Sequence, residues 1–514
     1  MNTKQLKAKV LDLAIHGKLL SPETVAELKK SPDYETADVL LEKIRKEKEE
    51  KIAKGELKRD KKDSYIFVGD DKRHYEKFAD GTVKDIEDEI PFDVPEGWAW
   101  CQIKNLVKYI GDGDWIESKD QSDKGIRLIQ TGNIGLGNFK DKEGKYHFIS
   151  EQTFNTLQCN EIFEGDILVS RLPEPVGRAC VLPKCNYRMI TAVDCTILRL
   201  NEKIIEKDFF VYYTQSNKYL ELIKENCTGT TRLRISRANL EKIYVPIPPK
   251  LIQKAIVSDI NKYDSTINSI ENDRNDITLT INKAKSKILD LAIHGKLVPQ
   301  DANDEPASVL LEKLRAEKEE KIAKGKLKRD KNDSYIYKGS DNCYYEKFAD
   351  GKTETIEVPF ELPITWNWCF FGEISTVING KNQSRVENPN GQYPIYGSGG
   401  LMGRADDYIC PENCTIIGRK GSINNPLFVT EKFWNVDTAF GLCANNLVLP
   451  KYLFFFCKTF DFTTIDSSTT LPSLTKTNIQ HILFPLPPLE TQKRIIEKIE
   501  LLFIELDKII LDLL

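Results

Sequence analysis

Residues 40–66 read LLEKIRKEKEEKIAKGELKRDKKDSYI, and residues 310–336 read LLEKLRAEKEEKIAKGKLKRDKNDSYI. The two stretches differ at only four of their 27 positions. The repeat continues downstream through YEKFADG, which begins at Tyr75 and again at Tyr345. Self-similarity of this kind indicates a duplicated architecture. We therefore expect one structural frame that occurs twice in the chain.

A second repeat closes the far end of each half. NLEKIYVPIPPKLIQKAI from Asn239 pairs with NIQHILFPLPPLETQKRI from Asn478. Between the repeats lie residues 104–238 and 370–477, which share no obvious sequence with each other. We call these two stretches the first and second divergent segments. The repeated parts are predicted to be scaffold, and the divergent segments two interchangeable recognition parts.

The stretch after the first Pro-Pro is predicted to form one helix over residues 251–296, about 70 Å long at 1.5 Å per residue. Its apolar residues step by three and four, as in the heptad seam of a coiled coil. They are Ile256, Ile260, Tyr263, Ile267, Ile270, Ile277, Ile281, Ala284, Ile288 and Leu291. The C-terminus repeats the seam at Ile495, Ile499, Leu502, Leu506, Ile509 and Leu513.

The two ends of the chain tile this helix when the repeats are superposed. The Pro-Pro repeat places Leu514 over Asn275, and the LDLAIHGKL repeat of residues 11–19 places Met1 over Leu279. We therefore predict that the N- and C-terminal helices lie end to end and pack antiparallel against the central helix. The molecule would then have a pseudo-twofold axis.

The repeats divide the chain into seven segments. These are a scaffold helix (1–20), a charged repeat segment with its lead-in (21–103), a first β-rich domain (104–246), a central spacer helix (247–297), a second charged repeat segment (298–369), a second β-rich domain (370–485) and a C-terminal helix (486–514). We expect a mixed α/β fold in which two long antiparallel coiled-coil helices separate two β-rich domains.

Short β-rich runs alternate with turns in both divergent segments. The first contains GIRLIQTGNIGLGNF from Gly125, GDILVSR from Gly165, ACVLP from Ala179 and DCTILRL from Asp194, with a helix expected around FFVYYTQSNKYLELI from Phe209. The second contains YPIYGSGG from Tyr393, NCTIIGRKGS from Asn413 and KYLFFFCKTF from Lys451. Each is predicted to be a compact α/β unit with a β core.

The composition is that of a globular protein. With 514 residues, 40% of them apolar and 30% charged, the chain has room for two to four domains. We expect a cytoplasmic protein, since no long apolar run or secretory signal is evident. The twelve cysteines are irregularly spaced, so most are expected to be free thiols without zinc. A net charge of -4 leaves room for local basic faces.

The charged segments 42–62 and 312–331 are dense in Lys, Arg and Glu. Their spacing suits an exposed helix with ion pairs between residues four apart. One interpretation is a solvated face, and the other is docking to a partner subunit or to phosphates. The near-identity of the two copies favours the same task performed twice.

The order of these elements resembles the specificity subunits of type I restriction–modification enzymes. PEGWAW and PITWNW open the divergent segments, and a PxPP element with a long helix closes each of them. Further strings are similar to ones common in that family's target-recognition domains, namely IQTGNI from Ile129, GDILVSR, PIYGSGG from Pro394, IIGRKGS from Ile416 and FWNVDTAF from Phe433. The resemblance covers essentially the whole chain.

The resemblance implies two target-recognition domains that each read one half of an asymmetric bipartite DNA site. Two unlike domains on a symmetric frame suit an asymmetric sequence, whereas identical ones would read a palindrome. Helix length would set the number of unread bases between the halves. Two methyltransferase subunits are expected on the repeated scaffold, with restriction subunits joining that core. No cofactor is expected on this chain, and S-adenosylmethionine, ATP and Mg²⁺ are expected on the partner subunits.

Polar side chains at loop tips are the candidate DNA contacts, because Arg suits guanine and Asn or Gln suits adenine in the major groove. In the first segment they are Gln130, Thr131, Asn133, Arg171, Arg178, Arg232, Arg234 and Arg237. In the second they are Asn379, Lys381, Ser398, Arg419, Lys420, Ser422, Asn424 and Lys476. The basic run TGTTRLRISR from Thr228 has a less basic counterpart, SSTTLPSLTK from Ser467, where hydroxyls and a helix N-terminus would serve phosphate.

Other conspicuous residues are predicted to be structural. Trp98, Trp100, Trp366 and Trp368 are expected to anchor domain packing, because they sit at a repeated junction. His16 and His294 occupy the ends of scaffold helices and are expected to be structural too.

Catalytic motifs are not evident. The GKT at Gly351 lacks the earlier glycine of a phosphate loop, since Glu346 stands there, and NNPLF from Asn424 lacks the adjacent prolines of an adenine methyltransferase motif. We predict a non-catalytic recognition subunit with no metal site. Two alternatives are a self-contained methyltransferase or nuclease with unrecognised motifs, and a coiled-coil adaptor with two protein-binding heads.

Overall fold

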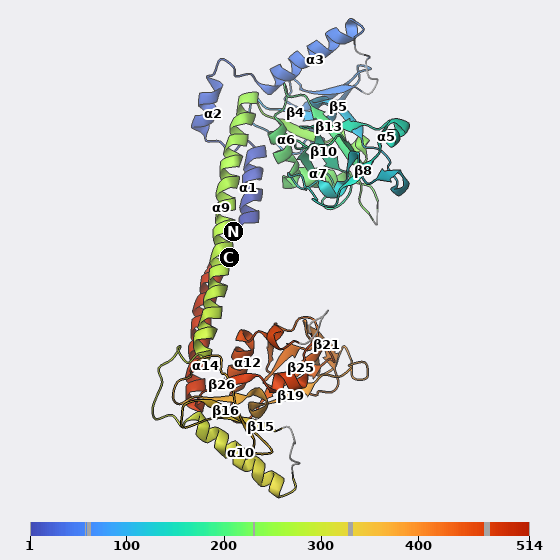
Figure 1. Cartoon of the computed structure of the whole chain (residues 1–514). Coiled ribbons are helices and arrows are strands. Elements are labelled where there is room, and N and C mark those ends of the chain that lie inside the picture. Colours follow the sequence, from blue (N-terminus) through green and yellow to red (C-terminus); the bar gives the residue numbers. More distant parts are fainter. Residues whose placement is uncertain are drawn as a thin grey trace. The chain divides into compact units, whose positions relative to one another are not determined.

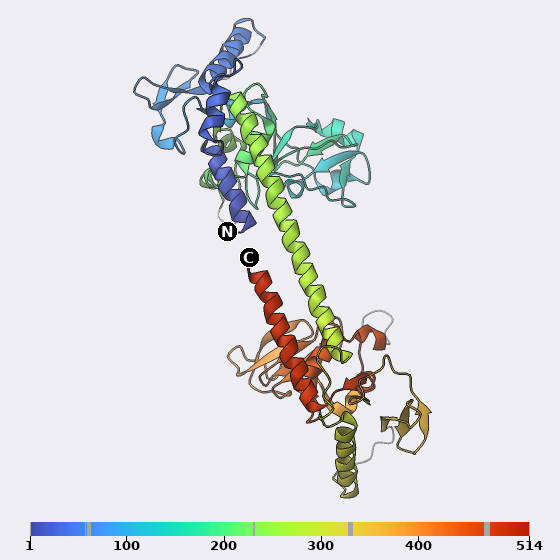
Figure 2. The same ribbon diagram turned by 90° about the vertical axis from the view of Figure 1, so that its left-hand side faces the viewer.

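The computed structural model describes residues 2–56, 58, 63–229, 232–326, 333–466 and 473–512. Contacts divide the chain into two compact units, Met1–Asp273 and Arg274–Leu514. Each unit has a β-rich body with helices packed on it (Figure 1), and the same elements are visible from the side in Figure 2. The predicted mixed α/β class is confirmed in both units.

The elements that the two units share occur in the same order, and α2, α5 and α7 occur in the first unit alone among the described residues. First-unit helices are α1 Thr3–Ile15, α2 Pro22–Lys29, α3 Ala37–Ala53, α4 Ile103–Leu106, α5 Glu151–Leu157, α6 Lys207–Thr214, α7 Asn217–Glu225 and α8 Arg237–Leu240. Second-unit helices are α10 Ala307–Ala323, α11 Phe371–Ile374, α12 Pro450–Thr459, α13 Lys476–Gln480 and α14 Leu489–Asp512. The long helix α9, Lys250–Ile293, has residues in both units.

A small antiparallel sheet follows each charged helix. In the first unit it is formed by β1 Ser64–Val68, β2 His74–Phe78 and β3 Val83–Asp85. In the second it is formed by β15 Ser334–Lys338, β16 Tyr344–Phe348 and β17 Thr353–Thr355. We call α3 with β1–β3, and α10 with β15–β17, the two copies of the appended module.

A two-stranded ladder opens and closes each divergent segment. In the first unit β4 Ala99–Gln102 pairs with β14 Tyr244–Ile247, and in the second β18 Asn367–Phe370 pairs with β26 Leu483–Leu486. Trp100 lies opposite Pro246 and Trp368 opposite Pro485. The entry and exit of each segment are therefore held side by side by repeated sequence.

The divergent segments share one sheet topology although they share no obvious sequence. The main sheets have the order β11-β10-β13-β5 and β23-β22-β25-β19. Their strands are β5 Val107–Asp112, β10 Ile167–Ser170, β11 Ala179–Val181, β13 Cys195–Leu200, β19 Ser375–Asn379, β22 Cys414–Gly418, β23 Leu427–Val429 and β25 Ala439–Ala444.

A second sheet lies beside each main sheet, and it is larger in the first unit. Its orders are β6-β8-β7-β12-β9 and β21-β20-β24. The strands are β6 Gln121–Ser122, β7 Ile126–Ile129, β8 His147–Ile149, β9 Glu161–Ile162, β12 Met189–Thr191, β20 Tyr393–Gly397, β21 Gly400–Ala405 and β24 Trp434–Asn435. The strand predictions in both segments are confirmed, whereas KYLFFFCKTF forms helix α12.

Each terminal helix packs antiparallel on its own half of α9. In the first unit Lys7 pairs with Asp264 at 3.2 Å, whereas Leu20 lies beside Ile252 and Ile256. In the second unit Lys285 pairs with Asp507 at 2.5 Å. There the other end of α14 is tied by Arg494 and Thr491 to Asp304, which follows α9. That the two terminal helices lie end to end stays a prediction.

The predicted seam of α9 is only partly buried. Ile256, Ile260, Ile267 and Ile281 are buried, but Tyr263, Ile270 and Ile277 are exposed, so the prediction was wrong for these three. The terminal helices contact only parts of the seam, and an apolar side chain without a packing partner stays in solvent. Leu513 lies outside the described residues.

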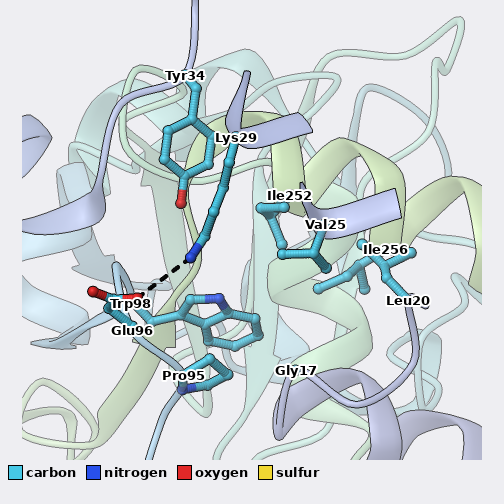
Figure 3. Close-up of a pocket in the computed structure, with 10 residues that line it drawn as sticks. All are labelled: Gly17, Leu20, Val25, Lys29, Tyr34, Pro95, Glu96, Trp98, Ile252 and Ile256. Carbon is cyan, nitrogen blue, oxygen red and sulfur yellow. Dashed lines mark hydrogen bonds and ion pairs between the residues drawn. The ribbon is translucent and has the colours of Figure 1, made fainter. Parts of the chain in front are cut away.

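The glycine of the LDLAIHGKL repeat turns the chain against the start of a divergent segment. Gly17 has a φ of +66°, and a Cβ there would lie 2.4 Å from Cγ of Pro95. Gly295 has a φ of +67°, with Cγ of Pro363 at 2.5 Å. Figure 3 shows Gly17 with Pro95 and Trp98 in a small pocket whose far wall is Ile252 and Ile256 of α9. This close approach accounts for the repeated glycine.

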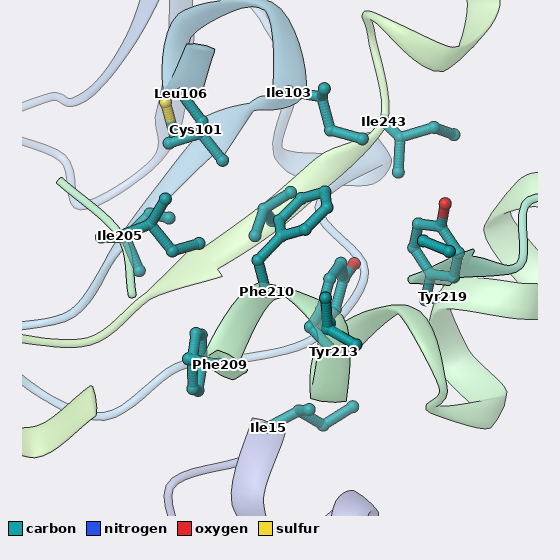
Figure 4. Packing of buried hydrophobic residues seen from close by; sticks show 14 of the residues in the cluster. Ile15, Cys101, Ile103, Leu106, Ile205, Phe209, Phe210, Tyr213, Tyr219 and Ile243 are labelled. Carbon is teal, nitrogen blue, oxygen red and sulfur yellow. The ribbon is translucent and has the colours of Figure 1, made fainter. Parts of the chain in front are cut away.

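A large apolar core joins the scaffold of each unit to its divergent segment. In the first unit, Ile15 of α1 lies by Phe209 and Tyr213 of α6 (Figure 4). At the start of α9, the buried amide of Gln253 donates to the carbonyls of Ile204 and Pro248 at 2.9 and 2.8 Å.

Its repeat partner at the start of α14, Gln492, donates to the carbonyls of Leu447 and Pro487 at 3.0 Å. The repeated PP…Q string therefore fixes each long helix to the β body that precedes it.

Several sequence predictions concern single side chains. The four tryptophans are buried, as predicted for packing anchors, and the rings of His16 and His294 pack on Phe92 and Phe360. Helices α3 and α10 are shorter than predicted, because Gly55 and Gly325 adopt positive φ just after them. Parts of the charged segments, 57, 59–62 and 327–332, lie outside the described residues.

The cysteines are mostly free, as predicted. One disulfide, Cys414–Cys443, joins β22 to β25, and the other ten cysteines are free thiols. Within the described residues, no helix is long and apolar enough to cross a membrane. No group of three or more His, Cys, Asp or Glu side chains in that same part of the chain could hold a metal ion.

Candidate nucleic-acid interface

Five loops of the first unit meet at one edge of its two sheets. They are residues 112–114, 130–133, 171–178, 192–194 and the described part of the arginine loop, 232–237. Main-chain hydrogen bonds join them. The amide of Asp114 donates to the carbonyl of Thr191 at 2.8 Å, and that of Ala192 to Ile129 at 2.9 Å.

The loop that follows β10 is joined to two others through Arg171. Its amide donates to the carbonyl of Asp194 at 2.9 Å, and its carbonyl accepts from the amide of Ile235 at 3.3 Å. We call this set of loops the loop edge of the first unit.

The second unit builds the same loop edge with different side chains. The amide of Lys381 donates to Asn435 at 3.0 Å, and the amide of Val436 to Tyr396 at 2.9 Å. The carbonyl of Arg419 accepts from the amide of Leu474 at 2.9 Å, and its own amide donates to Thr438 at 2.8 Å.

These bonds align the two edges residue by residue. Arg171 corresponds to Arg419, Asp112 to Asn379, Asp114 to Lys381, Asp194 to Thr438 and Ile235 to Leu474. Most predicted contact residues of both segments therefore lie at equivalent loop edges.

Repeated asparagines close the last loop of each edge. The side-chain amide of Asn239 donates to the carbonyl of Asn226 at 2.9 Å, and that of Asn478 donates to Ile465 at 2.9 Å. Scaffold sequence therefore holds both ends of a loop whose tip differs between the units. Part of SSTTLPSLTK, residues 467–472, and residues 230 and 231 of TGTTRLRISR lie outside the described residues.

The second loop is followed by α13, a helix of five residues. The side chain of Thr475 caps its N-terminus by accepting from the amide of Asn478. The hydroxyl of Thr475 therefore already accepts from one of the helix N-terminal amides that we expected to bind phosphate. Lys476 begins this helix and is exposed.

Arg178 has a structural role in this edge. Its side chain is buried, and its guanidinium donates to four main-chain carbonyls at 2.7 to 2.9 Å, those of Ile134, Leu172, Pro175 and Thr131. Burial lowers the pKa of Arg178. The side chain holds the loops of 130–134 and 171–178 together, and in this conformation it offers little to DNA.

Asn133 is also committed within the protein. Its side chain is buried, accepts from the amide of Gln130 at 3.0 Å and donates to the carbonyl of Lys140 at 3.0 Å. Gln130 and Thr131 are half-buried beside it. Asn133 therefore shapes the turn that presents its two neighbours.

The arginine loop carries the most accessible cations of the first edge. Arg232, Arg234 and Arg237 are exposed, whereas Arg171 is buried behind them. Desolvation lowers the pKa of Arg171, and Asp112 opposes that shift. Its Nε has no hydrogen-bond partner among the described atoms.

Two carboxylates that the sequence analysis missed stand among these arginines. Arg234 pairs with Asp194 at 2.8 Å, and Asp112 lies 3.5 Å from both Arg171 and Arg237. No sequence signal distinguishes these aspartates from ordinary turn residues, because Asp112 is the last residue of β5 and Asp194 directly precedes β13. Only the alignment of the loops brings them to the arginines.

The second edge is less charged. Ser398 is half-buried beside Gly418, and Lys420 and Ser422 are exposed in the loop after β22. Asn379 and Lys381 are exposed at the end of β19. The remaining candidate, Asn424, is bound within the protein: it donates to Asp461 at 2.6 Å and accepts from the amide of Phe462 at 2.8 Å.

The sequence matches a family model described as the type I restriction modification DNA specificity domain, over residues 95–279 and 363–513. The two matches cover more than half of the chain and include both loop edges. The chain belongs to the type I restriction–modification specificity family. Each unit carries one DNA specificity domain together with its half of the long-helix scaffold.

Two curated members of the specificity family illustrate the likeness. The type I restriction enzyme EcoAI specificity subunit of Escherichia coli is 24% identical, and the match covers 97% of this chain and 88% of that protein. The EcoEI specificity subunit of Escherichia coli is also 24% identical, over 72% of this chain and 61% of that protein.

A solved structure has the same fold as this chain. It comes from a study of complex assembly and conformational transition of the type I R-M system, with a TM-score of 0.51 and 13% identity. The match covers 82% of this chain and 94% of that one. Members of the specificity family are the non-catalytic DNA-recognition subunits of restriction–modification complexes. This confirms the prediction of a non-catalytic recognition subunit.

Replacing Arg178 with alanine should destabilise the first unit. The change removes one donor from each of four carbonyls. Those of Thr131 and Leu172 keep another donor, in the amide of Ile134 and the hydroxyl of Ser170, whereas the loops of 130–134 and 171–178 lose their shared side chain. We expect this to cost about 3 kcal/mol of the free energy of unfolding. Urea denaturation of the full-length chain measures this. The control, Arg232→Ala, removes an exposed side chain and should change stability by about 0.5 kcal/mol or less. Equal stability of the two variants would contradict the structural role.

Proposed function

We propose that this chain selects the DNA sequence for a type I restriction–modification enzyme, each unit reading one half of an asymmetric bipartite site. The observation that supports this most directly is the pair of loop edges. They share a main-chain hydrogen-bond frame but differ at nearly every polar side chain. A common frame would place both edges on DNA in the same way, and the side chains would then choose the bases.

The two edges offer different chemistry to base edges. The first presents guanidinium groups among carboxylates, whereas the second presents Lys420, Ser422 and Lys476 with a single half-buried arginine, Arg419. Arg and Lys favour guanine, and hydroxyls accept or donate to several bases. Two different half-sites are therefore expected.

Partner subunits would supply the chemistry. We propose that two methyltransferase subunits bind the repeated scaffold, that restriction subunits join that core, and that S-adenosylmethionine, ATP and Mg²⁺ act on those partners. Methylation and cleavage would then be directed to the site this chain selects. The chain is expected to bind DNA tightly only with its methyltransferase partner.

The two copies of the appended module are candidates for partner docking. They lie outside the residues matched by the family model, and their sequences are nearly identical over residues 40–66 and 310–336. In one copy Arg45 lies 4.1 Å over the ring of Tyr65, and in the other Arg315 lies 4.1 Å over Tyr335. These four side chains are half-buried, and the same arginine–tyrosine pair forms part of the surface in both copies. A surface that occurs twice suits two copies of one partner.

The aromatic face of each module continues onto its second strand. Phe67 stacks on Tyr75 at 5.7 Å, and Tyr337 stacks on Tyr345 at 5.6 Å. Lys77 lies opposite Tyr65 in the first copy, and Lys347 opposite Tyr335 in the second. Both lysines are exposed, so substituting them tests this face without disturbing the hydrophobic core.

A chimera made only from this chain tests the two-site reading. Replacing residues 104–238 with residues 370–477 gives both units the second divergent segment. Methylome mapping in cells that also contain the partner subunits should then show an inverted repeat of one half-site, because identical domains on a symmetric frame read a palindrome. The reverse chimera should repeat the other half-site. An unchanged asymmetric sequence in either chimera would reject the proposal.

Lengthening α9 tests its role as a spacer. Duplicating the heptad of residues 270–276 keeps the seam in register and adds about 10 Å, so the gap between half-sites should grow by up to about three base pairs. Methylome mapping reads both the gap and the half-sites, which should stay the same. As a control, the same seven residues inserted after Gly144, in an exposed turn, should leave the gap unchanged. An unchanged gap in the α9 variant contradicts a spacer.

Charge reversal on the appended modules tests partner docking. Lys77→Glu or Lys347→Glu should each remove one of two methyltransferase subunits, and the double variant should remove both, because a reversed charge at an interface costs several kcal/mol. Light scattering of the co-purified complex measures its mass. Lys124→Glu, an exposed lysine of the first divergent segment, is the control. Normal assembly of the double variant would place the docking surface elsewhere.

A further inference from the structure

The arginine loop of the first unit is held by two carboxylates, and the equivalent positions of the second unit carry Asn379 and Thr438. Asp194 pairs with Arg234 at 2.8 Å, and Asp112 lies 3.5 Å from Arg237. The hydroxyl of Thr196 donates to Asp112 at 3.2 Å, which fixes that carboxylate at the end of its strand. These contacts join three separate loops of the edge.

The equivalent positions of the second unit show that carboxylates and arginines occur together. Asp112 corresponds to Asn379 and Asp194 to Thr438, as the main-chain bonds align them. The repeat offset places Ser473 at Arg234 and Lys476 at Arg237. Where the arginines are replaced, both aspartates are replaced too. Such paired replacement indicates that the aspartates serve the arginines and not the fold, which both units share.

Electrostatics separates two uses of such an arginine cluster. A phosphate site gains from every unpaired positive charge, and a neighbouring carboxylate repels the phosphate. In this cluster Glu241 also lies 3.2 Å from Arg237, so Arg234 and Arg237 are largely neutralised. A site that reads bases needs direction more than charge, because the planar guanidinium must present two donors to one base edge.

The arginines keep donors free for such a contact. The side chain of Arg234 is 48% exposed and that of Arg237 is 45% exposed, although one carboxylate holds Arg234 and two hold Arg237. Holding one side of a guanidinium fork fixes the direction of the other side, as outer hydrogen-bond partners do for metal-binding histidines. The cluster is therefore pre-organised toward solvent.

From these observations we infer that Asp112 and Asp194 are positioning residues for base recognition. They orient Arg237 and Arg234 toward guanine in the half-site of the first unit. The inference rests on the proposed function, since it assigns a base and a mechanism to one of the two loop edges. It gives the first half-site at least one G·C pair whose recognition depends on these carboxylates.

The test uses the full-length chain with its methyltransferase partner and double-stranded oligonucleotides carrying the site mapped by methylation. Asp194→Asn and Asp112→Asn are compared with the unchanged chain on the mapped site and on duplexes with each G·C pair of either half changed to A·T. Binding is measured over a range of salt concentrations. Glu151→Gln is the matched control, because Glu151 pairs with the 45% exposed Arg188 at 2.7 Å, at the opposite end of strand β12.

The aspartate variants are expected to lose about tenfold of the discrimination at one G·C pair of the first half-site. The second half-site and the salt dependence should not change, and the control should behave as the unchanged chain does. Tighter binding with a steeper salt dependence and intact discrimination would identify a phosphate site and overturn the inference. If the aspartate variants discriminate as well as Glu151→Gln does, Asp112 and Asp194 form only ordinary surface ion pairs. That result would also overturn the inference.

Lysine variants separate charge from direction. Arg234→Lys and Arg237→Lys keep the positive charge but lose the planar fork, so they should lose the same discrimination as the aspartate variants. Lysine variants that bind and discriminate normally would contradict the inference. If the unchanged chain with its partner selects no bipartite sequence, the proposed function itself fails. If it selects one and the variants alter nothing in the first half, only this inference fails.

Discussion

The pairing of the two strands that flank each divergent segment is the constraint on which the molecule depends. β4 with β14, and β18 with β26, bring the two ends of a segment together on repeated sequence, with Trp100 and Trp368 buried at the junctions. The sequence between two paired flanking strands can change without moving the scaffold. The paired ends therefore allow two recognition domains of unlike sequence to use the same frame.

Side-chain amides of the repeated sequence extend this constraint to the helices and loops. Gln253 and Gln492 fix the start of each long helix to the β body, and Asn239 and Asn478 close the last loop of each edge. All four bind main-chain carbonyls, so their function does not depend on which side chains the divergent segments carry. This explains why the PxPP strings repeat while the loops between them do not.

The loop edges show how one frame can hold two electrostatic surfaces. In the first unit arginines and aspartates occur together, and in the second both are replaced by hydroxyl, amide and lysine side chains. An arginine without its carboxylate would point less consistently, and an aspartate without its arginine would repel DNA. The charges of an edge therefore have to change as a group.

Much of this architecture could be predicted from the sequence, because duplication is visible in the letters themselves. The long helix expected over residues 251–296 forms over Lys250–Ile293, and the tryptophans at the repeated junctions are buried. The roles of individual arginines could not be predicted: Arg178 is bound by four carbonyls, whereas Arg234 is exposed beside Asp194.

The sequence by itself determined the repeat, the class of fold and the family resemblance, since these depend on local pattern. Only the tertiary structure decided that Arg171 and Arg419 are equivalent, and which charges face each other. The reason is physical. Main-chain amides and carbonyls make that alignment, and they leave no trace in the identity of the side chains.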